Sequence, residues 1–430
     1  MTERPEHERR SLGFGSLLAL GVNGIVGVGI FFAPSEVAGL VPGTAGVWVY
    51  ALTALGLLPV ALAYAALGSR FPEDGGPYVW ARAAFGPAAG FAVGWVAYVS
   101  ALFSCSAVIA GLAQHAGPLF GLEGELGRRA FAVLAVLGLA GTAASGLRPS
   151  AWVWSGITLL KLVPLLVLAA LFVVHPRPMP STTASEGAGF ARAALVVVFA
   201  TQGFEIVPVP AGNARAAARA VPFATVGSLV LASLLYVVLH AACVGALPGL
   251  ASSKAPLVAL GGELGGASVA SLVAVGTNVS ALGIAFGMFA MTPRYLATLG
   301  RPEALGSWLG REDARHVPQR ALWITVAVVL VLVLSGRLME LFALSSVAVL
   351  AQYGMSLASL VKLAVARERG LGLGHAWPAP LALGAVWLVA RAAKVGELLV
   401  GAAVLGAGAV LLWVRRRFWV ARRSRPDGFQ

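Results

Sequence analysis

Two ionisable side chains stand out because each lies inside a long apolar stretch of sequence. Lys161 occurs in Thr-Leu-Leu-Lys-Leu-Val-Pro, and Glu205 occurs in Gly-Phe-Glu-Ile-Val-Pro. Taking a charge out of water costs free energy, so an ionisable residue in such a place favours a functional role. Each has a structural alternative. Lys161 can extend its amine toward a polar boundary, and Glu205 can form hydrogen bonds across irregular backbone.

Glycine and proline interrupt two of the apolar stretches near their middle. The first stretch has glycines at positions 21, 24, 27 and 29, and the second has Gly203 followed by prolines at 208 and 210. Glycine weakens a helix and proline removes a backbone donor, so both stretches are expected to unwind. Close packing of glycine-rich helix faces is the alternative explanation.

An interrupted helix can bind a ligand with two opposite charges. The half that starts at the break presents backbone N–H groups to an anion, and the half that ends there presents carbonyls to a cation. An α-amino acid carries both charges. The two breaks are five spans apart and their helices start on opposite sides, as an inverted five-plus-five repeat would produce. We therefore favour a substrate site of the kind found in secondary transporters.

The composition requires a lipid environment for the elements that carry these residues. Of 430 residues, 58% are hydrophobic and 11% are charged, whereas a soluble domain has about 25% charged residues. The net charge of +13 is interpreted as loop Lys and Arg that orient a membrane protein rather than as a nucleic-acid surface. No cleaved leader is expected. Cys105 and Cys243 are interpreted as small packing residues.

Twelve apolar segments are long enough to be candidate membrane-spanning helices. They cover residues 14–40, 44–69, 87–117, 129–147, 151–174, 190–212, 223–247, 267–291, 322–336, 339–363, 379–393 and 398–414. The sequence therefore predicts an all-α polytopic membrane protein. The expected division is a polar tail (1–11), a core of ten helices (12–365), two further helices (366–414) and a basic tail (415–430).

The charge distribution orients these helices. With the N-terminus in the cytoplasm, 22 of the 31 Lys and Arg residues fall in cytoplasmic segments, 8 fall outside, and Lys161 lies within a span. This bias follows the positive-inside rule. An odd number of spans would place the Arg-rich C-terminal tail outside. We expect both termini in the cytoplasm, and the Ala-, Gly- and Arg-rich composition suggests the inner membrane of a GC-rich bacterium.

Enzymatic activity is not expected. The six histidines are scattered, with no His-x-x-x-His or His-Glu-x-x-His pair, and neither a Gly-x-Ser-x-Gly motif nor a phosphate-binding loop occurs. We predict no cofactor and no metal site. A channel and a non-transporting sensor remain open as alternatives. The oligomeric state is also left open.

Several local motifs together give the chain a family resemblance. They are Gly27-Val-Gly-Ile-Phe31, Arg70-Phe-Pro-Glu-Asp-Gly-Gly-Pro-Tyr78, Gly86-Pro87, the segment from Phe199 to Glu205, and Pro293-Arg294-Tyr295. In this combination the sequence resembles the amino acid–polyamine–organocation (APC) transporters over residues 12–365. The resemblance implies a five-plus-five inverted repeat with broken helices 1 and 6, two additional C-terminal helices, and alternating access.

One segment departs from the family pattern. The stretch before helix 7 usually contains Glu-x-x-x-Asn-Pro, whereas this chain has Asn213 and Pro222 without the acidic residue or the Asn-Pro pair. Details of cytoplasmic gating are therefore not transferred from the family.

The resemblance assigns substrate-binding roles to both breaks. The first would bind the carboxylate through backbone N–H groups, and the second, with the start of the first, would bind the ammonium through carbonyls. The residues are Gly27, Val28, Gly29 and Ile30 for the carboxylate, and Asn23, Phe199, Ala200, Thr201 and Gln202 for the ammonium.

Three residues are candidate gates. Phe204 follows the second break, where an aromatic ring covers the substrate in the family, and Tyr353 lies on helix 10. Core packing is the alternative for Phe204. For Glu205 a structural or gating role is preferred to direct binding of an ammonium. Further polar or aromatic residues could face the pathway, although packing or interhelical hydrogen bonding is the simpler role for each: Trp95, Tyr98, Ser104, Ser106, Asn278 and Ser280.

Lys161 suggests how transport is driven. In some sodium-independent members of the family, a helix 5 lysine lies where relatives bind sodium. The resemblance therefore implies proton coupling through Lys161 or sodium-independent exchange. The core spans contain few acids that could pair with a cationic substrate, so we expect neutral amino acids with small or aliphatic side chains. Glu205 keeps cationic amino acids and polyamines as the alternative.

Overall fold

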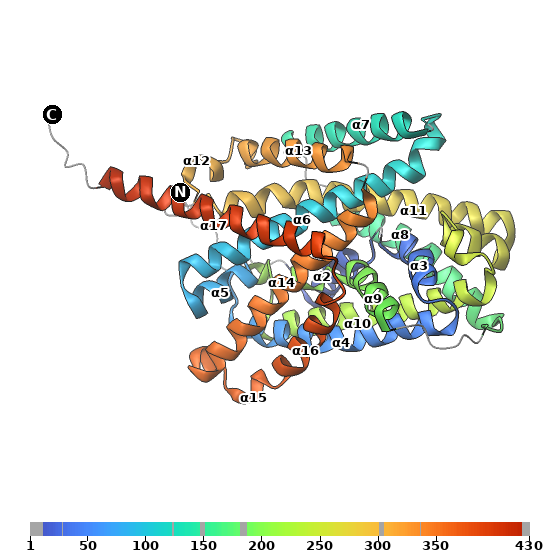
Figure 1. Ribbon diagram of the computed structural model, residues 1–430, viewed down its shortest axis with the longest axis horizontal. Helices are drawn as coiled ribbons and strands as arrows, with labels where there is room; N and C mark the ends of the chain where they lie inside the picture. Colours follow the sequence, from blue (N-terminus) through green and yellow to red (C-terminus); the bar gives the residue numbers. More distant parts are fainter. Residues whose placement is uncertain are drawn as a thin grey trace. The chain divides into compact units, whose positions relative to one another are not determined.

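The computed structural model describes residues 12–27, 29–122, 124–146, 151–180, 187–300, 305–335 and 337–423. Within them the chain is almost entirely helical, and the described residues form no β-strand beyond one isolated bridge between Leu12 and Ala214 (Figure 1). Since apolar segments in lipid must satisfy their backbone groups internally, helices are the expected solution.

The chain divides into two compact units. The first contains residues 1–85, 149–284 and 350–393, and the second contains 86–148, 285–349 and 394–430. Two helices have residues in both units: α11 (Pro256–Thr298) and α14 (Leu338–Val365).

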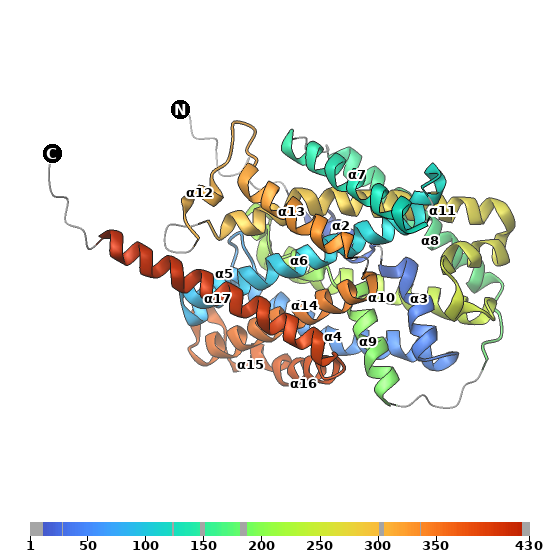
Figure 2. The same ribbon diagram turned by 45° about the horizontal axis from the view of Figure 1, so that its top comes forward.

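The first unit holds both interrupted helices. Its other members are α4 (Thr44–Arg70), α5 (Pro77–Phe85), α8 (Ala151–Val174), α10 (Ala217–Ala246), α15 (Leu373–Ala376) and α16 (Pro378–Ala390). Helix α10 packs against α4, α8 and the first interrupted helix, and α4 also packs against α16. Figures 1 and 2 both show α4 and α10 side by side.

The first interruption divides α2 (Phe14–Ile25) from α3 (Gly29–Leu40), and the two helices are bent by 44°. The second follows α9 (Gly187–Thr201). There, within the predicted segment 190–212, α9 gives way to two short 3₁₀ helices, η2 (Phe204–Ile206) and η3 (Ala211–Asn213), so the interruption expected from the sequence is present. Pro208 and Pro210 prevent a regular helix from resuming after the break, since proline cannot donate the backbone hydrogen bond of a regular helix.

The second unit contains α6 (Pro87–Ala116), α7 (Gly124–Ala144), α12 (Ser307–Gly310), α13 (Gln319–Leu334) and α17 (Val395–Arg423). Helix α13 packs against α6 and α7, and α6 also packs against α17. Trp95 of α6 donates a hydrogen bond to the Val404 carbonyl at 2.8 Å, and the hydroxyls of Tyr98 and Thr325 lie 3.2 Å apart. These two aromatic residues thus make the interhelical bonds expected as their simpler role.

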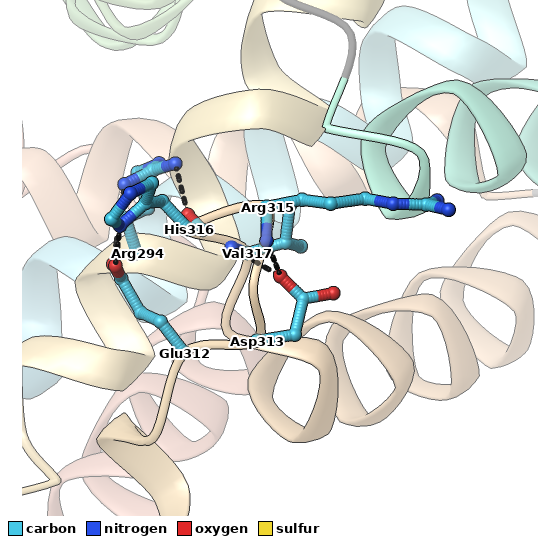
Figure 3. A network of polar contacts seen from close by, with 6 residues as sticks. All are labelled: Arg294, Glu312, Asp313, Arg315, His316 and Val317. Carbon is cyan, nitrogen blue, oxygen red and sulfur yellow. Dashed lines mark hydrogen bonds and ion pairs between the residues drawn. The ribbon is translucent and has the colours of Figure 1, made fainter.

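A network of polar contacts stabilises the loop that connects α11 to α13 in this unit (Figure 3). Arg294 lies 3.6 Å from Glu312 and donates a hydrogen bond to the His316 carbonyl at 3.0 Å. Asp313 accepts hydrogen bonds from the Val317 N–H at 3.0 Å and the Gln319 side chain at 2.8 Å. The bonds from Gln319 and Val317 lower the pKa of the Asp313 carboxyl.

Membrane crossing can be judged from helix length and composition. Eight helices of the described chain are long and apolar enough to span a membrane, and the bent pair α2–α3 raises that number to nine. Three shorter apolar helices, covering Leu160–Val174, Gly189–Thr201 and Gln319–Leu334, lie in the remaining predicted segments. The chain is therefore a polytopic helical membrane protein, and the expected twelve crossings stay a prediction.

Candidate substrate site at two helix breaks

The two helix breaks contact each other through their backbones within the first unit. At Gly203, φ is +130°, and a Cβ added there would lie 2.6 Å from the Gly24 carbonyl oxygen. A Cβ added at Gly29 would lie 2.6 Å from the Cα of Ala200. Only glycine permits this approach and, at Gly203, this backbone conformation. The sequence predicted both interruptions, and the structure brings them together.

Side chains from other helices hold the carboxyl end of α2. The Lys161 amine, on α8, donates hydrogen bonds to the carbonyls of Asn23 at 2.8 Å and Val26 at 2.6 Å. The Tyr236 hydroxyl, on α10, donates to the Ile25 carbonyl at 3.0 Å. The last carbonyls of a helix lack intrahelical donors and attract positive charge. The amine and the hydroxyl therefore supply the donors that the carboxyl end of α2 lacks.

Lys161 is thereby placed away from the protein surface. Its side chain is fully buried, so it does not extend to a polar boundary. Its amine binds the Asn23 carbonyl, one of the groups expected to face a substrate ammonium. Tyr236 was not identified from the sequence, because a tyrosine in an apolar helix carries no local signal of its partner.

At the second break, the chain's own carboxylate binds the freed backbone. Glu205 Oε2 accepts a hydrogen bond from the Gly203 N–H at 2.7 Å and another from the Tyr353 hydroxyl at 3.1 Å. Glu205 and Tyr353, both candidate gates, are thus brought together. The bond links the break to α14 within the first unit.

An aromatic cluster lies beside this bond. The ring of Phe204 is 5.5 Å from that of Tyr353 and 6.0 Å from that of Tyr64, and Tyr64 is 5.1 Å from Trp80, measured between centroids. All four side chains are fully buried. The Ser356 hydroxyl donates to the Tyr64 hydroxyl at 3.0 Å. Tyr64 and Trp80 were missed in the sequence, since membrane aromatics are usually simple packing residues.

The remaining predicted binding residues line the same two breaks. Gly27, Gly29 and Ile30 are buried at the first break; Phe199, Ala200 and Thr201 are buried at the end of α9, and Gln202 is partly buried. The Thr201 hydroxyl bonds to the Val197 carbonyl at 2.7 Å, so it is directed along its own helix. Val28 lies outside the described residues.

The loop after the second break is held by two distant segments. Asp74 accepts a hydrogen bond from the Gly212 N–H at 2.9 Å, and the Gly75 N–H donates to the Val209 carbonyl at 2.8 Å. The Arg215 N–H donates to the Leu12 carbonyl at 2.8 Å. The Asp-Gly-Gly motif noted in the sequence therefore contacts the segment that departs from the family pattern.

Comparison with known proteins identifies the family of the chain. The family model described as amino acid permease matches residues 12–417. An uncharacterised transporter of Mycobacterium tuberculosis is 28% identical over 98% of this chain and 94% of its own length.

Two relatives have named substrates. An arginine/ornithine antiporter of Pseudomonas aeruginosa is 27% identical over 74% of this chain and 70% of its own length. A branched-chain amino acid permease of Lactococcus lactis is 27% identical over 76% of each chain. The family and these names indicate a transporter rather than an enzyme. The chain belongs to the amino acid permeases of the APC superfamily and is an integral, multi-pass amino acid transport protein.

Proposed function

We propose that the protein is a sodium-independent secondary transporter of neutral amino acids that works by alternating access. The carrying observation is the backbone contact of the two breaks at Gly24 and Gly203. Because the breaks adjoin, one small ligand bound there would contact both the amino end of α3 and the carboxyl end of α9. Backbone N–H groups of Gly27, Val28, Gly29 and Ile30 bind its carboxylate, and carbonyls of Phe199 to Gln202 bind its ammonium.

The commitment of the two ionisable groups favours a neutral substrate side chain. Glu205 already accepts hydrogen bonds from Gly203 and Tyr353, and Lys161 donates to two backbone carbonyls. A cationic or acidic substrate side chain would have to replace one of these partners. Leaving the replaced group buried and unpaired would cost about 1–3 kcal/mol.

The Lys161 contacts also support sodium independence. Carbonyl oxygens are ligands that sodium uses at broken helices, and here an amine binds two of them. A proton, rather than a sodium ion, is then the coupling ion if transport is driven uphill, with Lys161 as the group that releases and regains it. Sodium-independent exchange of one amino acid for another is the second mode.

The aromatic cluster supports a gate beside the substrate. Phe204 lies next to the second break and packs on Tyr353, whose hydroxyl bonds to Glu205. A change at the break that moved Glu205 would also move both rings. We assign Phe204, Glu205 and Tyr353 to this gate.

The inverted repeat and the orientation belong to the same proposal. Interrupted helices at the first and sixth positions, both in the first unit, support a five-plus-five core over residues 12–365. Residues 366–414 then supply two additional helices. The 22-to-8 bias of Lys and Arg supports cytoplasmic tails at 1–11 and 415–430, and the bacterial relatives support an inner-membrane location.

A cationic amino acid or polyamine exchanger is the alternative, and the arginine/ornithine antiporter among the relatives favours it. A sensor that binds amino acids without transporting them is a further alternative on the same fold.

Binding followed by counterflow tests the proposal. Purified protein is screened by thermal shift against the amino acids and polyamines, since a ligand of the folded state raises the melting temperature (Tm). Ligands that bind are then tested for counterflow in liposomes with and without sodium. Counterflow of a neutral amino acid without sodium is expected. Exchange of arginine or polyamines alone would favour the alternative, binding without counterflow would favour the sensor, and no binding would contradict the proposal.

A further inference from the structure

Four polar side chains lie in the interface between α4 and α10, which run side by side in the first unit (Figures 1 and 2). Among the residues that the structure describes, no hydrogen-bond partner is found for Tyr50 Oη, Thr53 Oγ1, Ser233 Oγ or either ring nitrogen of His240. Their exposed fractions are 1%, 6%, 7% and 0%, respectively. A buried polar group normally has a partner, so four such side chains in one interface call for an explanation.

Their spacing places them on facing surfaces of the two helices. Tyr50 and Thr53 are three residues apart on α4, and Ser233 and His240 are seven apart on α10, so each pair lies on one helix face. The rings of Tyr50 and His240 are 4.7 Å apart between centroids. Gly46, one turn before Tyr50, lets α4 approach His240: a Cβ added there would lie 2.7 Å from Nε2.

The Thr53 and Ser233 hydroxyls could have bonded within their own helices, as their neighbours do. On α10, the Thr225 hydroxyl donates to the Val221 carbonyl at 2.8 Å and the Ser228 hydroxyl donates to the Thr225 carbonyl at 3.2 Å. Helical Ser and Thr commonly make this bond. Ser233, on the same helix, does not make it, so its hydroxyl remains available to a partner in the interface.

The chemistry of the four groups defines that partner. A neutral imidazole offers one donor and one acceptor, and each hydroxyl offers both. The charged residues of α4 and α10 are Arg70 and Arg219, each about twenty residues along its helix from Tyr50 and His240. An ion would therefore have no counter-charge from these two helices, and the fitting ligand is small, uncharged and both donor and acceptor. Water meets all three conditions and commonly bridges buried polar groups.

We propose that the α4–α10 interface is a hydration site that binds water through Tyr50, Thr53, Ser233 and His240. The site adjoins the first helix break, because Tyr236 lies between Ser233 and His240 along α10 and donates to the Ile25 carbonyl. This assignment does not depend on the transported substrate.

The sign of a change in melting temperature tests the site. In Tyr50→Phe and Ser233→Ala, loss of a water ligand lowers Tm by about 2 °C, whereas removal of a dry, unpaired hydroxyl raises it. Ser228→Ala is the matched control on α10, since its hydroxyl already bonds within the helix. The proposal predicts that Ser233→Ala lowers Tm at least as much as the control. An unchanged or raised Tm in both site variants would overturn it.

Radiolytic labelling of the unaltered protein gives an independent reading. X-rays split water into hydroxyl radicals that oxidise side chains beside it, including buried ones. Tyr50 and His240 should be oxidised faster than Phe289, which is 1% exposed and apolar. Oxidation of both residues no faster than that of Phe289 would contradict a hydration site, whatever the variants show.

Discussion

The two helix breaks of the first unit are held in opposite ways. At the first, carbonyls of α2 receive hydrogen bonds from Lys161 and Tyr236, which belong to other helices. At the second, an N–H group is bound by Glu205, two residues further along the same chain. The charge at each break suits the backbone group it meets, an amine for carbonyls and a carboxylate for an amide.

This difference indicates what each break can do. The first depends on the positions of α8 and α10, so movement of either helix relative to α2 would change its hydrogen bonds. The second contains its own acceptor, Glu205, whose carboxylate also accepts a hydrogen bond from the Tyr353 hydroxyl on α14. We expect perturbation of the first break to alter substrate binding, driving force and stability, and perturbation of the second to alter gating.

Gly203→Ala should have the largest effect, because both breaks meet at this residue. Alanine is strained at a φ of +130°, and its Cβ would overlap the Gly24 backbone. We expect a loss of at least about 3 kcal/mol of stability and no transport, measured by Tm and liposome uptake. Gly39→Ala is the control, since no atom lies within 4 Å of the added Cβ; wild-type behaviour of Gly203→Ala would refute the contact.

Lys161→Met should have the next largest effect and acts on the first break alone. It removes two hydrogen bonds and leaves buried carbonyls, at a cost of about 2–4 kcal/mol. Uptake should fall by at least about tenfold, because the same hydrogen bonds order the break at the proposed substrate site and about 1.4 kcal/mol of lost binding energy there corresponds to a factor of ten. The residual uptake should lose its dependence on pH. If the pH profile of Lys161→Met matches the wild type, the proton role of Lys161 is wrong.

Tyr236→Phe and Tyr353→Phe compare the breaks directly, since each removes one hydroxyl from one break. Each should lower stability by about 1 kcal/mol. We expect Tyr236→Phe to reduce binding of substrate, measured as a higher Kd, and Tyr353→Phe to reduce the maximal exchange rate with Kd nearly unchanged. Identical effects of the two variants on both quantities would remove the distinction between the breaks.

The smallest effect is expected in the second unit, at Asp313. Its pKa is lowered by bonds from Gln319 and Val317, so the native loop favours the charged form. Its contribution is therefore present above its ordinary pKa and is lost as the pH falls through the lowered value. Asp313→Asn should increase hydrogen exchange in the 311–319 loop without changing transport. A large loss of transport would contradict a purely structural role.

The sequence could predict the breaks but not their partners. Glycines at 24 and 203 and prolines at 208 and 210 are local signals of interrupted helices. Contact between Gly24 and Gly203 depends on how α2 and α9 pack, which no local pattern encodes. Lys161 was noticeable as a buried charge, whereas its acceptors, Asn23 and Val26, became evident only from the positions of the helices.

The same reasoning explains the errors in helix bounds. Helix α10 begins at Ala217, before the predicted residue 223, because an alanine-rich turn tolerates Pro222 in its early part. Helix α17 continues to Arg423, beyond the predicted residue 414. Hydrophobicity marks the part of a helix that suits lipid, while the helix itself continues through polar residues that retain helical propensity.

Ligand analogues test the central claim, that the amino end of α3 and the carboxyl end of α9 bind one zwitterion. A bound, radiolabelled neutral amino acid is displaced from the purified protein by the unlabelled amino acid, by the amine that lacks its carboxylate, and by the carboxylic acid that lacks its amine. The account predicts that each analogue displaces the label at least about 100-fold more weakly, since charge-assisted hydrogen bonds at one break are lost. Either analogue displacing the label as well as the amino acid would contradict it.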